Sequence, residues 1–104
     1  MSRGPDAATL LQRALLDSAA RAGCPVRLAA ADWTRWASVT FSGARHMFAI
    51  EGEASDALDA WLAALPEAEF ALSGHLVADL TVMSARRQGE AVRAEIEVLT
   101  VEVR

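Results

Sequence analysis

The sequence has a single cysteine, Cys24, and its ten basic residues are all arginine, with no lysine. One cysteine cannot form an internal disulfide, which agrees with a reducing compartment. The absence of lysine indicates a compositional bias rather than a function.

Long apolar runs are also missing. The longest are short pieces such as Leu28 to Ala31, well below the roughly 20 residues that a membrane-spanning helix needs. The N-terminal stretch MSRGPDAATLLQRALLD interrupts its apolar positions with polar and charged residues, whereas a secretory signal has a continuous apolar block. The sequence therefore predicts a cytoplasmic protein that does not act at a membrane.

A concentrated basic surface is not expected either. The net charge is -4 and the arginines are scattered along the chain, so the electrostatic footprint of a nucleic-acid-binding protein is missing. With 53% hydrophobic and 23% charged residues, the chain has the composition of a globular protein. A length of 104 residues predicts one domain over residues 1–104, because two halves would be too small to fold separately.

Two segments have the spacing of amphipathic helices. The first runs from Asp6, a candidate N-cap, to Ala22, and Gly23 follows where a helix commonly ends in a left-handed residue. The second runs from Ser55, another candidate N-cap, to Leu65 and is ended by Pro66.

The segment between these helices predicts three strands. Residues 26–30 alternate like a short edge strand after Pro25, and 32–36 fit a loop. Residues 36–53 read as a hairpin, with Gly43 and Ala44 as the two-residue turn. This register pairs Phe41 with His46, Val39 with Phe48 and Ala37 with Ile50, which gathers apolar residues on one face.

The C-terminal part predicts a further hairpin. Apolar residues keep one parity from Ala68 to Val82, with a bend near Gly74. If Gly89 is left-handed in a three-residue loop, Arg86 pairs with Glu90. After Val98 the parity changes, so that Leu99, Val101 and Val103 become the apolar positions. Either a bulge near Val98 restores the phase, or the end of the strand is buried on its reverse face.

These elements predict an α+β two-layer sandwich in the order α-β-β-β-α-β-β. About five mostly antiparallel strands form the sheet, and both helices cover one face. The other face is left uncovered and should be mixed in character. Its expected residues are Ser38, Thr40, Met47, Val77, Asp79, Thr81, Arg93, Glu95 and Leu99.

His75 and Asp79, four residues apart in SGHLVADL, resemble a catalytic pair. On a strand they share a face but lie two pleat repeats apart, roughly 13 Å, so they cannot form a dyad. The predicted register sets Asp79 opposite Glu97 and His75 opposite Val101. We expect a solvated polar face here, in preference to paired carboxylates for acid–base work or metal binding.

His46 is the stronger candidate, because the predicted turn places it on the apolar face. It either caps the core through one hydrogen bond or lies at the mouth of a ligand pocket between sheet and helices. Trp33, Trp36 and Trp61 would line that pocket. Cys24 follows a helix end, which favours a structural thiol. No catalytic motif, metal site or cofactor is predicted.

Three functions follow from these features. The first is a non-enzymatic domain that self-associates, as a homodimer, through the uncovered face or through the sheet edge and end. Its predicted interface residues are His75, Val77, Leu99, Val101 and Val103. The second is a small-molecule-binding protein or enzyme with its pocket at His46. The third is an accessory domain for an unidentified protein partner.

Overall fold

The computed structural model describes residues 6–103. Helix α1 spans Ala7–Arg21, and the Asp6 carboxylate caps it by accepting a hydrogen bond from the Thr9 backbone N–H at 2.9 Å. That hydrogen bond lowers the pKa of Asp6. The helix buries one apolar stripe and stops before Gly23, which adopts a φ of 83°. Both predicted ends of this helix are confirmed.

A second, shorter helical segment follows the first hairpin. Helix α2 spans Asp56–Ala64, is capped by the Ser55 hydroxyl and continues into a 3-10 turn, η1, at Leu65–Glu67. Trp61 of α2 donates a 3.0 Å hydrogen bond from its indole Nε1 to the Ser18 hydroxyl of α1. The two helices are therefore joined directly as well as through the core.

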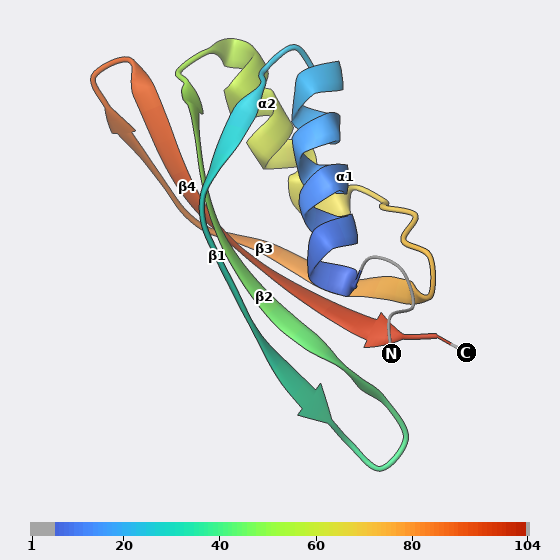
Figure 1. Cartoon of the computed structure of the whole chain (residues 1–104). Helices are drawn as coiled ribbons and strands as arrows, with labels where there is room; N and C mark the ends of the chain where they lie inside the picture. The colour runs from blue at the N-terminus through green and yellow to red at the C-terminus, as the bar shows by residue number, and fades with distance from the viewer. Residues whose placement is uncertain (1–5, 104) are drawn as a thin grey trace.

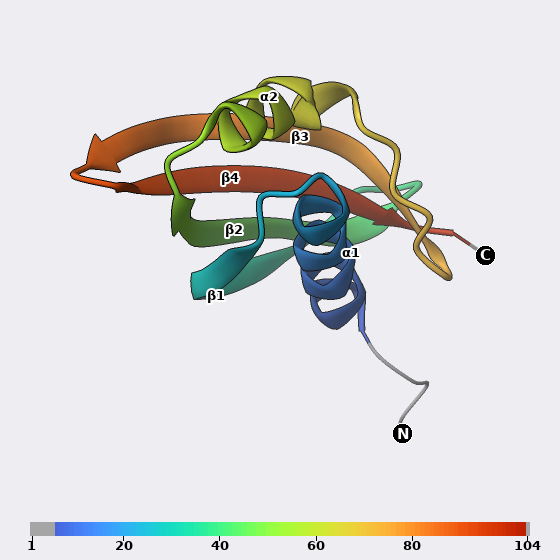
Figure 2. The same cartoon turned by 90° about the horizontal axis from the view of Figure 1, so that it is seen from above.

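Four strands form one antiparallel sheet in the order β1-β2-β4-β3. They are β1 (Val26–Ala37), β2 (Ser42–Glu53), β3 (His75–Gln88) and β4 (Ala91–Glu102). Both helices pack on one side of this sheet, and no described element covers the other (Figures 1 and 2). The predicted α+β class and two-layer arrangement are confirmed, with four strands in the order α-β-β-α-β-β.

The strand count differs because residues 26–53 form one long hairpin, with no loop at 32–36. The predicted turn at Gly43 is wrong: the chain turns at residues 38–41, and Gly43 pairs with Trp36 and with Val101 inside the sheet. A Cβ atom on Gly43 would collide with the carbonyl oxygen of Thr100. The glycine is needed for close backbone approach and not for a turn.

The chain runs through the order α-β-β twice. The second-half elements begin at a constant offset from their counterparts, as shown by Ala7 and Asp56, Val26 and His75, and Ser42 and Ala91. Both helices lie on the same side of the sheet (Figure 2). The core then fills only the side between helices and sheet, around Phe48, Ile50 and Ile96.

The two edge strands carry the irregularities of the sheet. An extra residue interrupts the pairing of β1 at Ala29, and two interrupt that of β3 at Ala78 and Met83. Because a bulge shifts side chains to the other face, the single parity predicted from Ala68 to Val82 is wrong. Leu76, expected in the core, points away from it and is 60% exposed.

The last hairpin keeps the predicted left-handed glycine, since Gly89 has a φ of 63°. The turn is nevertheless shorter than predicted, because Gln88 pairs with Ala91. As a result, Arg86 pairs with Arg93 instead of Glu90. Strand β4 has no bulge, and buried Thr100 continues the core-facing parity. Of the two alternatives for the parity change, the structure therefore shows apolar residues on the reverse face.

The molecule is elongated, with principal extents of 45 × 24 × 22 Å. Its radius of gyration of 14.0 Å exceeds the roughly 13 Å of a compact chain of this length. Both hairpins extend past the helices, as Figure 1 shows. Among the residues that the structure describes, no helix is long and apolar enough to cross a membrane.

Candidate functional site

The side of the sheet away from the helices is the candidate functional surface. Residues that are paired directly across an antiparallel ladder share a face, so the register assigns each side chain. Most of the residues predicted for this face lie on it, namely Met47, Asp79, Thr81, Arg93, Glu95 and Leu99. Val77 lies on the helix side because of the bulge at Ala78, and Ser38 and Thr40 belong to the turn.

One row of this face is apolar across all four strands. Trp36 pairs with Gly43, Gly43 with Val101, and Val101 with Leu76. The missing side chain at Gly43 leaves room for Trp36, whose Cζ2 atom would lie 3.0 Å from a Cβ at that position. The indole Nε1 of Trp36 is buried without a hydrogen-bond partner in the structure. We call these three side chains and the neighbouring Leu99 the apolar row.

Charged residues of both signs also lie on this face, beside uncharged residues such as Met47 and Thr81. Glu51 bridges Arg27 on β1 and Arg93 on β4, the latter at 2.9 Å, and Arg45 lies 3.5 Å from Glu97. The predicted pairing of Asp79 with Glu97 is wrong, because Asp79 pairs with Leu99 and Thr81 with Glu97. Like charges are therefore not opposed at this point of the ladder.

The predicted interface residues divide between the two faces. Leu99 and Val101 belong to the apolar row, and Val103, just beyond β4, is 47% exposed. His75 and Val77 lie on the helix side, where His75 pairs with Glu102, not with Val101, and Val77 packs against the core. The bulge at Ala78 separates them from the row.

His46 lies in the core, with only 1% of its surface exposed. Its Nε2 atom is 2.9 Å from the Thr100 hydroxyl, its ring stacks on Phe48 at 5.9 Å, and its Nδ1 has no partner in the structure. Burial lowers the pKa of His46, and the charge of His75 acts in the same direction, while that of Asp6 opposes it. Of the two alternatives, this geometry matches a histidine held in the core by one hydrogen bond.

The three tryptophans do not gather around His46. Trp33 pairs with it on the helix side, but Trp36 lies on the opposite face, because three residues along a strand reverse the direction. Trp61 is buried in α2 against Ser18. Cys24 is a buried free thiol whose pKa is raised by burial.

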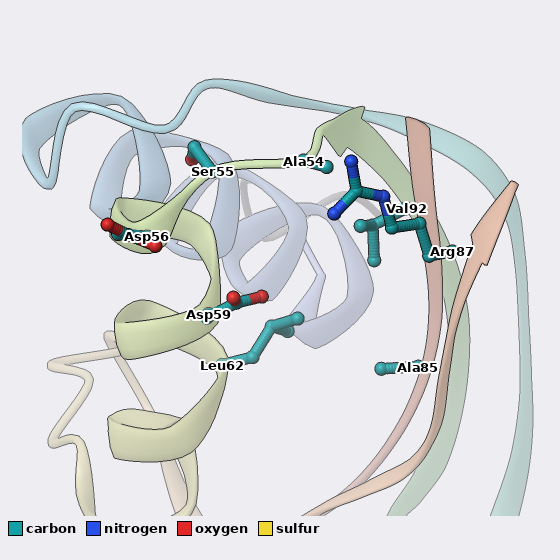
Figure 3. A pocket seen from close by; sticks show the side chains of 8 residues that line it. All are labelled: Ala54, Ser55, Asp56, Asp59, Leu62, Ala85, Arg87 and Val92. Atoms are coloured by element: carbon teal, nitrogen blue, oxygen red, sulfur yellow. The ribbon is translucent and has the colours of Figure 1, made fainter. Parts of the chain in front are cut away.

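A pocket that the sequence did not indicate lies at the other end of the molecule, between α2 and the β3–β4 hairpin (Figure 3). Its volume is about 360 Å³, and its walls include Asp59 and Arg87. These two residues are far apart in the chain and belong to no motif. Only the correct register of β3 would have predicted that both line one pocket. Within residues 6–103, no cluster of three or more potential metal ligands is present.

Comparison with known proteins does not assign a family. No family model matches the chain, and no similar protein or solved structure was found.

Proposed function

We propose that the chain is a non-enzymatic, self-associating domain of the cytoplasm, with a second copy seated face to face on the uncovered side of the sheet. The observation that carries this proposal is the apolar row. Trp36, Val101 and Leu76 share one row across the sheet, with Gly43 of β2 between Trp36 and Val101, on a face that no described helix covers. A contiguous apolar stripe of this kind, with polar surroundings, is typical of an interaction site.

The size of the face suits a dimer. Four strands at a spacing of about 4.8 Å, each contributing about eleven residues of about 3.3 Å, give a surface of roughly 700 Å². Two copies would then bury roughly 1,400 Å², within the range of about 1,200–2,000 Å² that stable interfaces occupy. Twist of the sheet makes this figure an upper bound.

The charges on the face favour another copy of the same chain over a strongly basic or acidic partner. Arg27, Arg45 and Arg93 lie among Glu51 and Glu97, with ion pairs linking them in the protomer. A two-fold axis can place arginines of one copy against carboxylates of the other. The surface is thus self-complementary in charge, although the whole chain carries a net charge of -4.

The sheet edges are less suitable for association. Pairing through an edge needs a regular row of free N–H and C=O groups, and bulges disrupt that row. All three bulges lie in the edge strands, at Ala29 in β1 and at Ala78 and Met83 in β3. Face-to-face packing is therefore the arrangement that the register supports best.

Matched glutamate variants test the proposal. Val101→Glu places a charge in the apolar row, and Val39→Glu makes the same change at a fully exposed turn residue outside the face. We expect Val101→Glu to raise the dissociation constant of the dimer by about tenfold or more, because an unpaired charge is costly to bury. Sedimentation velocity at matched concentrations should show no such change for Val39→Glu. Equal masses for the two variants and the wild type would contradict the proposed interface.

A further inference from the structure

The pocket between α2 and the β3–β4 hairpin exists because the helix is shorter than the hairpin. α2 has nine residues, whereas β3 continues to Gln88. Arg87 pairs with Val92 on the helix side of the sheet, and its side chain is exposed. The pocket therefore opens beside the end of the core, with buried Leu62 and Val92 in its wall.

Three charged residues line this pocket, namely Asp56 and Asp59 on α2 and Arg87 on β3. Asp59 directs its carboxylate into the space from α2, and the Arg87 guanidinium reaches toward it over Val92 (Figure 3). Among the residues that the structure describes, neither side chain forms an ion pair. The Arg87 Nε donates a 2.9 Å hydrogen bond to the Gly89 carbonyl, which anchors the side chain and leaves its terminal nitrogens free to donate.

We propose that this pocket binds a small zwitterion, namely an α-amino acid with an apolar side chain. Its ammonium group would contact Asp59, its carboxylate would accept hydrogen bonds from Arg87, and its side chain would lie on Leu62, Ala85 and Val92. A ligand with one charge would pair either with the carboxylates or with Arg87, and not with both. The volume of about 360 Å³ lies at the small end of the range for such sites, about 300–1,000 Å³.

The site is independent of the proposed dimer. Leu62, Ala85 and Val92 lie on the helix side of the sheet, whereas the apolar row lies on the reverse side. A second copy on the uncovered face would leave the pocket open. Binding and self-association can therefore be measured and can fail separately.

Leucine is the probe, and binding is followed by isothermal titration calorimetry and by methyl shifts in the NMR spectrum. We expect a dissociation constant of about 1 mM or tighter, which about nine non-hydrogen atoms can provide. The methyl signals of Leu62, Ala85 and Val92 should shift. Isopentylamine and 4-methylpentanoate carry one charge each and should bind at least about tenfold more weakly, because each loses a charge-assisted contact.

Charge-removing variants test the two contacts. Asp59→Asn and Arg87→Gln should each weaken leucine binding by about tenfold or more. The matched controls are Asp17→Asn, an exposed carboxylate on α1, and Arg86→Gln, whose side chain points to the other face. Both controls should bind leucine like the wild type. Circular dichroism checks that the variants fold, which is expected because Asp59 and Arg87 are exposed.

The proposal would be overturned by no binding of leucine at about 10 mM, well above the expected dissociation constant. Equal binding of the singly charged analogues, or equal loss in the control variants, would overturn it as well. Shifts confined to methyl groups outside the pocket would also contradict it.

Discussion

The Nε2 atom of His46 on β2 lies 2.9 Å from the hydroxyl oxygen of Thr100 on β4, inside the core. Thr100 directs its hydroxyl toward the Ala44 carbonyl, so Nε2 donates to Thr100 and Nδ1 is left as a bare acceptor. Protonating Nδ1 would add a buried N–H with no partner in the structure. The fold therefore favours the neutral imidazole.

We expect stability to depend on His46 below neutral pH. Burial lowers the pKa of His46 in the folded state from its ordinary value of 6.5, so the unfolded chain takes up the proton first. The contribution of neutral His46 to the free energy of unfolding is then fully present above about pH 6.5, and it decreases as the pH falls toward the lowered pKa. Urea unfolding at about pH 7.5 and about pH 5.0 should show this loss in the wild type and a smaller loss in His46→Gln.

The half-buried His75 provides the control for that measurement. A His75→Gln variant should keep most of the wild-type difference between the two pH values if His46 is responsible, because burial, the largest cause of the lowered pKa of His46, is unchanged. If the difference stayed the same in His46→Gln and disappeared in His75→Gln, His75 and not His46 would be responsible for the pH dependence.

Gly43 should be among the least tolerant positions of the sheet. Gly43→Ala drives a methyl group into the backbone of Thr100, which cannot move without breaking the β2–β4 ladder. We expect a loss of about 2–4 kcal/mol in the free energy of unfolding. Gly52→Ala is the matched control on the same strand, because its closest neighbour is a methyl group of Val26 at 3.0 Å and its closest backbone atom, the Pro25 carbonyl oxygen, is 3.3 Å away. A larger loss for Gly52→Ala would show that this account of Gly43 is wrong.

The hydrogen bond between Trp61 and Ser18 should contribute to the packing of α1 against α2. Ser18→Ala leaves the indole N–H without this acceptor and should lower the free energy of unfolding by about 1 kcal/mol. In a Trp61→Phe background the same change should have almost no effect, since the donor is already absent. A double-mutant cycle by urea unfolding measures the difference, and additive losses would exclude the interaction.

Local signals were enough to predict the helices and the fold class. Asp6 and Ser55 are N-caps, Gly23 ends α1 in a left-handed conformation, and the spacing of apolar residues fits one buried stripe on each helix. Leu99 and Val101, which follow the parity change after Val98, lie on the reverse face of the sheet, as one of the two predicted alternatives required. Caps and periodicity involve only residues close in the chain, so the sequence carries them directly.

The turn of the first hairpin could not be found in this way. It uses Ser38 to Phe41, which contain no glycine, proline, asparagine or aspartate, and it is closed by hydrogen bonds of Ser38 to Phe41. Gly43 was the expected turn residue because glycine suits turns, but its role depends on a strand that lies far away in the sequence. The predicted register of the hairpin was therefore shifted. It placed His46 correctly in the core but paired it with Phe41 instead of Trp33.

The candidate sites depend even more on long-range register. A bulge at Ala78 turns Leu76 outward and keeps Val77 on the core side, which reverses the predicted positions of these two residues. Neither a bulge nor the contact of Asp59 and Arg87 with one pocket leaves a local signal. The uncovered face of the sheet was predicted in outline, while the residues of the apolar row come from the register.

Sedimentation equilibrium of the wild-type chain over a wide range of concentrations measures whether a second copy covers the sheet. We expect a mass of about twice the 11.1 kDa of the protomer at high micromolar concentration, falling toward the protomer mass on dilution. A mass of 11.1 kDa at every concentration would contradict the claim that a second copy covers the sheet.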